Sequence, residues 1–187
     1  MTQRQTQYLI FFLYLKRLQK NSEIPSPLKL EFSIAILIAL KYKNKFFIRP
    51  NYKVDHVGKP YSHAPGNYGD IDVYSDMIYW LVEVTLIRNK AQQLNNETSS
   101  VIRHLNSDEE FKDHSNKYLS LIAPIIHVDT KDYFDISLIK SKVQGKKIYI
   151  KPYNIENFLS ITLARNNLLD MENYSKRIFK EFKSKLI

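Results

Sequence analysis

The sequence predicts an α/β fold in which a central mixed β-sheet is flanked by helices. Short runs of β-branched and aromatic residues alternate along the chain with longer segments that carry apolar residues at helical spacing. A length of 187 residues suits one domain, and the 44% of hydrophobic residues is enough for a sizeable core. We therefore expect one domain over residues 1–187.

The N-terminal segment predicts a helix. Its apolar run Tyr8–Leu15 is shorter than the roughly 20 residues that span a bilayer, and no signal-peptide cleavage site comes after it. We expect residues 1–26 to contain an amphipathic helix that packs on the core or contacts another subunit, with no membrane association. The absence of cysteine excludes disulfides and thiolate-bound zinc, and it fits a cytoplasmic location.

The later elements alternate between helix and strand. Helices are expected near Pro27–Lys43, Asn89–Leu105, Asp108–His114, Asp132–Lys140, Ile155–Asn166 and Leu169–Lys185. Strands are expected near Phe46–Arg49, Ile71–Tyr74, Ile78–Leu86, Tyr118–Val128 and Lys147–Lys151, with an extended loop before Gly69. The first and last of these helices carry one-sided apolar stripes, which indicates that they pack on the sheet.

A hairpin with its turn between Asp76 and Met77 sets two carboxylates against each other. In this register Asp70 lies across from Glu83, and both share one strand face with Asp72. The other face is apolar throughout and is expected in the core. Opposed like charges repel at a Cβ separation of about 5 Å, so a cation between them or a shared proton is expected.

Oxygen ligands of this kind favour Mg²⁺, which is typically held by one or two carboxylates together with water and substrate phosphate. In a chain with a net charge of +9, such a site points to metal-assisted hydrolysis of a phosphodiester. The alternative is that the acids form the solvated face of an ordinary hairpin.

The helix after this hairpin carries a polar face. Lys90, Gln93, Glu97 and His104 fall at spacings of three, four and seven residues, so they share one side of a regular helix. This side can point back at the two carboxylates. The alternative is a stripe that faces solvent.

The charge balance favours a polyanionic partner, with nucleic acid first. The densest basic stretch is "KSKVQGKKIYIK", residues 140–151, which contains five lysines and no acid. It either contacts phosphate or forms a hairpin edge that lysine keeps soluble.

Several motifs resemble those of one group of nucleases. Asp70, with Glu-Val-Thr thirteen residues later, resembles the PD-(D/E)XK nuclease core. More narrowly, the cleavage domain of AlwI-like type IIS restriction endonucleases and related nicking enzymes is similar to "PNYKVDHVGKPYSHAPGNYGDIDV", "WLVEVT", "QQLNNE", "RHL" and "LIAPIIHVDTKDYF". The likeness covers about Leu28 to Lys151.

The resemblance implies which residues hold the metal. Asp70 and Glu83 would ligate Mg²⁺, and the Val84 carbonyl would complete the set. Gly66 and Gly69 would let the backbone pass close to metal and phosphate.

The resemblance also implies supporting residues. Glu97 and His104 match polar positions behind the site that support it or handle protons, and Glu31 matches an extra acid on the first long helix. One departure concerns Thr85, which stands where the motif has lysine. The missing cation would then come from Lys90 or from a second metal ion.

The resemblance finally implies an assembly. The chain looks like the small, cleaving subunit of a heterodimeric type IIS endonuclease, whose large subunit would recognise double-stranded DNA and cut the other strand. Two alternatives are a non-catalytic DNA-binding module with a degenerate nuclease fold, for which Thr85 is the argument, and a structural subunit bound to an acidic protein.

Overall fold

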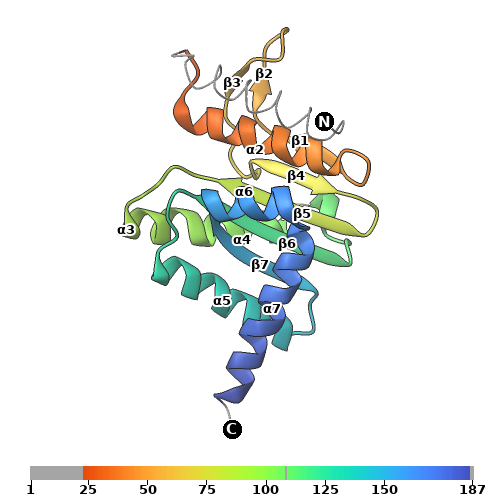
Figure 1. The fold of residues 1–187 in the computed structure, drawn as a ribbon, viewed down its shortest axis with the longest axis vertical. Helices are drawn as coiled ribbons and strands as arrows, with labels where there is room; N and C mark the ends of the chain where they lie inside the picture. The colour runs from red at the N-terminus through yellow and green to blue at the C-terminus, as the bar shows by residue number, and fades with distance from the viewer. Residues whose placement is uncertain (1–22, 108, 186–187) are drawn as a thin grey trace.

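The computed structural model describes residues 23–107 and 109–185, which form a five-stranded sheet between two layers of helices (Figure 1). The strand order is β1-β4-β5-β6-β7; the first three strands are antiparallel, and β6 and β7 continue parallel to β5. The predicted α/β class with a mixed sheet is confirmed. Most of the helix expected within residues 1–26 lies outside the described residues.

Strands and helices alternate over most of the chain. The strands are β1 (Phe47–Pro50), β2 (Lys53–Val54), β3 (Pro60–Ser62), β4 (Ile71–Tyr74), β5 (Ile78–Val84), β6 (Asn116–Ala123) and β7 (Ile148–Asn154). The helices are α2 (Ser26–Tyr42), α3 (Lys90–Gln92), α4 (Thr98–Ser107), α5 (Val128–Val143), α6 (Ile155–Ala164) and α7 (Asn167–Ser184). A π-helical turn, Gln93–Glu97, joins α3 to α4, and a 3₁₀ turn, Glu109–Phe111, precedes β6.

Asparagine side chains begin three of the helices. Asn89 accepts a hydrogen bond from the Gln92 N–H at the start of α3. Asn154 and Asn166 cap the first turns of α6 and α7 in the same way. Such caps satisfy backbone donors that have no partner inside the helix, and each stabilises its helix by about 1 kcal/mol.

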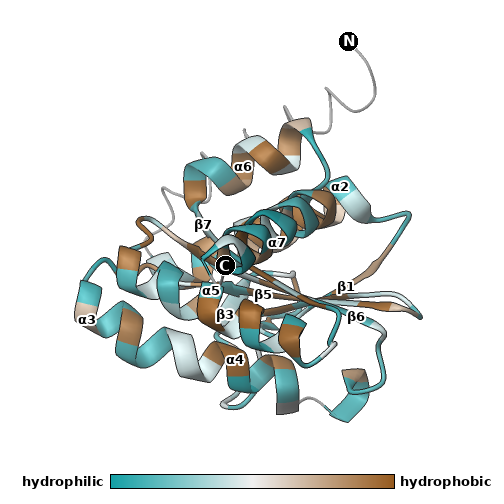
Figure 2. Cartoon of the chain, turned by 90° about the horizontal axis from the view of Figure 1, so that it is seen from below, coloured by the Kyte–Doolittle hydropathy of each residue, from teal (hydrophilic) through white to brown (hydrophobic). Residues whose placement is uncertain are grey.

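The two faces of the sheet bury two separate cores. The apolar face of the β4–β5 hairpin packs under α2, α6 and the start of α7, and it includes Trp80 and Val82, which are fully buried. The opposite face, with Tyr79 and Leu81, packs against α4, α5 and the middle of α7. Figure 2 shows α2, α6 and α7 on one side of the sheet and α3 and α4 on the other. None of the described helices meets the length and apolarity that crossing a membrane requires.

The β4–β5 hairpin has the predicted register. Ile71 pairs with Val82, so the preceding residue, Asp70, lies across from Glu83. The acidic face is not solvated, because Asp72 and Glu83 are only 1% and 6% exposed. The alternative of an ordinary solvated hairpin face is therefore wrong.

The loop before Gly69 differs from the expected extended chain, because it contains the short antiparallel pair β2–β3. The Asp55 side chain accepts hydrogen bonds from the N–H groups of Val57 and Lys59. Gly58 closes the turn at φ +80°, a conformation that glycine adopts without strain. In Figure 1 this hairpin projects beside α2.

The strand predicted over 118–128 is shorter at its end. β6 stops at Ala123, because Pro124 has no N–H to donate to the ladder. The chain then has room to begin α5 at Val128, four residues before the predicted start at Asp132.

Candidate active site

Asp70 and Glu83 meet at the edge of the sheet where β4 begins and β5 ends. The Val84 N–H donates a 2.7 Å hydrogen bond to Asp70 Oδ2. Burial raises the pKa of Glu83 to about 8, and the charge of Glu97 adds to the increase, while hydrogen bonds to Asp70 oppose it. Burial and then the charge of Glu83 raise the pKa of Asp70 well above its ordinary value. Two carboxyls this close do not both ionise readily, so a shared proton or a nearby cation would stabilise the pair.

Gly69, just before Asp70, packs tightly against β5. A Cβ on Gly69 would collide with the Leu81 side chain and would lie 3.1 Å from Glu83 Oε1. Gly66, in contrast, has open space where a Cβ would stand. The structure thus explains one of the two glycines by packing against the carboxylate strand.

Glu31 brings a third carboxyl to the pair from α2. Its side chain is buried, and its charge contributes to the raised pKa of Asp70. Glu31 Oε1 lies 2.6 Å from His63 Nδ1. Its other oxygen, Oε2, is buried and has no hydrogen-bond partner among the described residues. Burial raises the pKa of Glu31, and the contact with His63 opposes that increase.

Thr85 stands where the PD-(D/E)XK motif has lysine, and it interacts with Glu97. Its side chain is buried and its Oγ1 accepts a hydrogen bond from the Ile87 N–H at 3.2 Å. A hydrogen bond with Thr85 lowers the pKa of Glu97, whereas burial, the larger effect, raises it. The Thr85 hydroxyl therefore lies near the Glu97 carboxyl.

His104 reaches the pair from α4. Its Nδ1 lies 2.8 Å from Glu83 Oε1, and its side chain is 15% exposed. Burial and then the charge of Arg103 lower the pKa of His104, while Asp70 and Glu97 raise it. The contact joins an imidazole that tends to be neutral to a carboxyl that tends to hold a proton, so a proton can move between them.

The polar face predicted on the helix after the hairpin does not form as one face. The π-helical turn Gln93–Glu97 carries about one extra residue, which rotates the residues before the turn relative to those after it. Lys90 Nζ lies 2.9 Å from Asp129 Oδ2 on the exposed surface. The Gln93 side chain is buried and bonds to backbone groups near the start of α5. The structure brings Glu97 and His104 to the carboxyl pair, but not Lys90 or Gln93.

A sequence comparison places the chain in a known family. The family described as AlwI restriction endonuclease matches residues 4–161. The chain belongs to the AlwI restriction endonuclease family. The match extends past both ends of the segment from about Leu28 to Lys151 that carries the resemblance in the motifs. The resemblance is thereby confirmed, and the family is one of nucleases.

The fold agrees with this assignment. The small subunit of the heterodimeric restriction endonuclease R.BspD6I has a similar structure, with a TM-score of 0.68 and 20% sequence identity. The similarity covers 90% of this AlwI-family chain and 87% of that subunit. A comparison with curated proteins gives no match.

One network around the site of this AlwI-family chain has no signal in the sequence. Asp72 shares the strand face of Asp70, but its carboxylate accepts hydrogen bonds from Arg49 at 2.9 Å and from Asn51 at 2.8 Å. Asn51 Nδ2 also donates to the Gly69 carbonyl at 2.8 Å. The backbone N–H of Asn51 donates to the Asp70 carbonyl at 2.9 Å. Asn51 therefore fixes the backbone that presents Asp70. His63 was missed as well, because a single histidine in a loop has no pattern.

The donor set suits a hard divalent cation. Asp70, Glu83 and Glu31 offer only oxygen, and burial raises the pKa of each, with mutual repulsion adding to the increase for Asp70. The unpartnered Glu31 Oε2 is a further oxygen available to a cation or its water. Within residues 23–107 and 109–185, no three His, Cys, Asp or Glu side chains are already gathered as a metal-binding group. Water and backbone oxygen would have to complete the coordination.

Proposed function

We propose that this chain is the catalytic small subunit of a heterodimeric type IIS restriction endonuclease and that it hydrolyses one strand of double-stranded DNA with Mg²⁺. The observation that carries the proposal is the pair Asp70–Glu83, in which Glu83 is buried, Asp70 is half-buried and the pKa of both is raised. Family membership supports nuclease chemistry. A pair of acids that repel each other in the absence of metal is what a Mg²⁺ site needs.

Asp70 and Glu83 would hold the ion together with the Val84 carbonyl, and Glu31 would reach it directly or through water. When bound, Mg²⁺ would supply the positive charge that polarises the phosphate and stabilises the charge of the transition state. The PD-(D/E)XK arrangement is part of the same proposal, with Thr85 in place of the lysine.

The remaining polar residues would manage protons. Glu97, held by Thr85, has a raised pKa, which suits a group that accepts a proton from the attacking water near neutral pH. His104 would orient Glu83 through their 2.8 Å contact. Lys90 stays outside this proposal, because its ammonium pairs with Asp129.

The partner and location rest on similarity. The structural neighbour is the small subunit of a heterodimeric enzyme, and a matching large subunit would supply site recognition for this chain and cut the other strand. Such an enzyme would act on cytoplasmic DNA.

The competing function is a non-catalytic DNA-binding subunit. The replacement of lysine by Thr85 favours it, whereas the hydrogen bond between Thr85 and Glu97 gives Thr85 a place in a working site. The two functions differ in one observable, which is metal-dependent cleavage.

The test is cleavage of plasmid DNA with Mg²⁺ by the purified chain, alone and with a large nicking-type partner. We expect cutting of the second strand only with both subunits, and at least about 100-fold less in Asp70→Asn and Glu83→Gln. Glu156→Gln, on the exposed first turn of α6, is the matched control and should cut normally. Normal cutting by both site variants would refute the proposal. DNA binding without cutting in any combination would favour the degenerate module.

A further inference from the structure

We propose that a lysine-lined hollow between α4 and the first residues of β6 and β7 binds a phosphate of the DNA backbone about four nucleotides from the cleaved position. This inference rests on the proposed function only in taking DNA as the substrate. It concerns a surface whose lining residues do not include Asp70 or Glu83.

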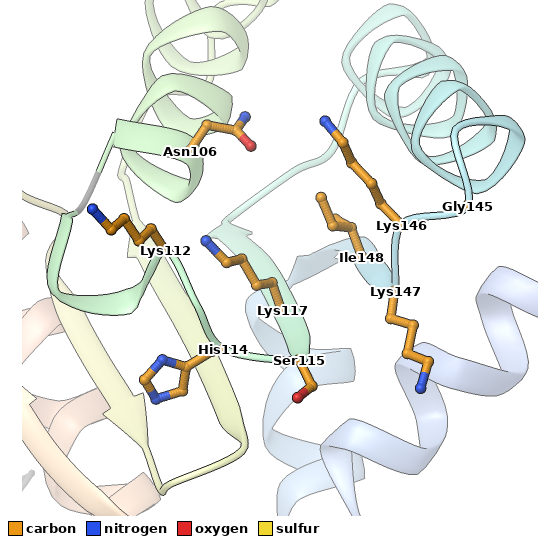
Figure 3. Close-up of a pocket in the computed structure, with 9 residues that line it drawn as sticks. All are labelled: Asn106, Lys112, His114, Ser115, Lys117, Gly145, Lys146, Lys147 and Ile148. Atoms are coloured by element: carbon orange, nitrogen blue, oxygen red, sulfur yellow. The ribbon is translucent and has the colours of Figure 1, made fainter.

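The hollow has a volume of about 510 Å³. Four of the described residues that line it are lysines and none is acidic: Lys112, Lys117, Lys146 and Lys147. Asn106 and Ser115 add polar groups. Figure 3 shows that Lys117 and Lys146 extend toward the open space from two different segments, while Lys112 and Lys147 point away from it. Lys112 pairs with Glu109 at 2.8 Å. Lys117, in β6, and Lys146, just before β7, are the probes of the site.

The backbone determines where the lysines stand. α5 ends just before Gly145, which has φ +73°, and the Lys146 N–H donates a 2.9 Å hydrogen bond to the Ser141 carbonyl. This glycine-terminated helix end turns the chain directly into β7 and leaves Lys146 at the rim. The basic stretch 140–151 is therefore the end of a helix and the strand after it. The expectation of a hairpin edge is wrong.

The chemistry of the lining favours phosphate over a protein partner. Lysine is depleted at the centres of protein interfaces, which are richer in aromatic residues and methionine. Ammonium, amide and hydroxyl groups around one hollow are donors that a phosphate accepts from. A second hollow of about 540 Å³ shares Asn106 and Lys146 with the first and runs on between α4 and α5, where Lys140 joins it. Basic lining thus continues over a length that a nucleic-acid backbone can track.

The position agrees with a strand that passes the candidate active site. In the register of β5 with β6, Lys117 lies beside Tyr79. Tyr79 precedes Glu83 by four residues in β5. Four strand residues span roughly 13 Å. Successive phosphates of one DNA strand are about 3.4 Å apart along the axis, so roughly four nucleotides cover that distance. The same helix, α4, carries His104 at the carboxyl pair and Asn106 at the hollow.

The test measures binding of the full chain to a duplex of about 30 base pairs, in EDTA, at salt concentrations from about 50 to 200 mM. We expect Lys117→Gln/Lys146→Gln to weaken binding at least about 5-fold at the lowest salt and to reduce the salt slope by about one to two. Lys176→Gln/Lys180→Gln on α7 removes the same charge from exposed positions outside the hollow, and should change neither quantity by that much. The single variant Lys146→Gln, also exposed, should show about half of the effect on the slope.

Three outcomes would overturn the inference. The first is a salt slope that stays unchanged in Lys117→Gln/Lys146→Gln. The second is an equal loss of DNA affinity in the α7 control, which would indicate an effect of net charge alone. The third is intact DNA binding with weakened association with a large subunit, because the hollow would then contact protein. Because EDTA prevents metal-dependent cutting, a chain that never cleaves DNA can still pass this test, so the two proposals fail separately.

Discussion

At the scale of single residues, the carboxyl pair costs stability whenever it is ionised without a cation. The folded pKa of Glu83 is about 8, against an ordinary value of 4.5, because the folded chain holds that proton more tightly. By linkage, the stabilisation is complete below the unfolded pKa and is lost as the pH rises through about 8. Functional sites often carry such a cost.

We therefore expect the melting temperature of the metal-free chain to fall between about pH 5 and pH 9. Glu83→Gln should flatten this dependence and exceed the wild-type chain in stability by about 1–3 kcal/mol near pH 9, since it removes one of two repelling charges. Thermal unfolding in EDTA at several pH values measures this. Mg²⁺ should raise the melting temperature of the wild-type chain most at high pH. An equally steep decline in Glu83→Gln would show that another group is responsible.

Thr85 allows a second test at this scale. Thr85→Val keeps the shape of the side chain but removes the hydroxyl that bonds to Glu97, so cleavage should fall about 10- to 100-fold, while the fold survives. Thr85→Ser retains the hydroxyl and is the matched control. Rates of single-strand cutting by both variants, with the partner present, decide the matter. Equal activity of Thr85→Val and Thr85→Ser would remove the hydroxyl and its hydrogen bond from the mechanism.

At the scale of elements, the hairpin and the strand β1 beside it form the frame of the site. The register of β4 with β5 sets Asp70 across from Glu83, and Asn51, just after β1, holds the backbone at Gly69 and Asp70. Asp72 anchors the Asn51 side chain from β4. The candidate site is thus supported by hydrogen bonds between groups that lie behind the carboxyl pair.

Asn51→Ala should separate positioning from folding. It breaks the side-chain bonds to the Gly69 carbonyl and to Asp72, so we expect a loss of about 1–3 kcal/mol of stability and a fall in kcat with little change in KM. Asn154→Ala removes a helix N-cap of about 1 kcal/mol and leaves the site untouched, so its kcat should be normal. Chemical denaturation and steady-state cleavage supply both quantities. If both variants lost activity in proportion to their loss of stability, stability alone would explain the effect of Asn51→Ala.

The π-helical turn is the second decisive element. One extra residue in a helical turn shifts the later side chains by about 100° around the axis. Glu97, the last residue of the turn, and His104, after it, face the carboxyls; Lys90, before the turn, faces Asp129. The turn thus changes the angle around the helix axis between Lys90 and the two residues that face the carboxyls.

At the scale of the whole molecule, the mixed sheet separates core from chemistry. One face is covered by α2, α6 and the start of α7, and the other by α4, α5 and the rest of α7, so both faces of β5 are buried. Glu83, on this strand, lies in a region of low dielectric, which raises its pKa. The net charge of +9 then favours approach of a polyanion to a locally acidic site.

The sequence by itself determined the elements whose signals are local. Strand alternation settled which face of the hairpin is core, and with it the pairing of Asp70 with Glu83, because a strand has a period of two and the wrong register would expose every apolar residue. Helical spacing placed α2, α6 and α7 to within a few residues.

Only the tertiary structure decided which charged groups meet. The contact of Glu31 with His63, the bond between Thr85 and Glu97, the pairing of Lys90 with Asp129 and the clamp by Asn51 all join elements that are separate in the fold. A local pattern encodes the face that a residue occupies, but the partner across from it depends on how distant elements pack. The π-helical turn also rotates the helix, and the spacing of apolar residues in the sequence gives no sign of this rotation.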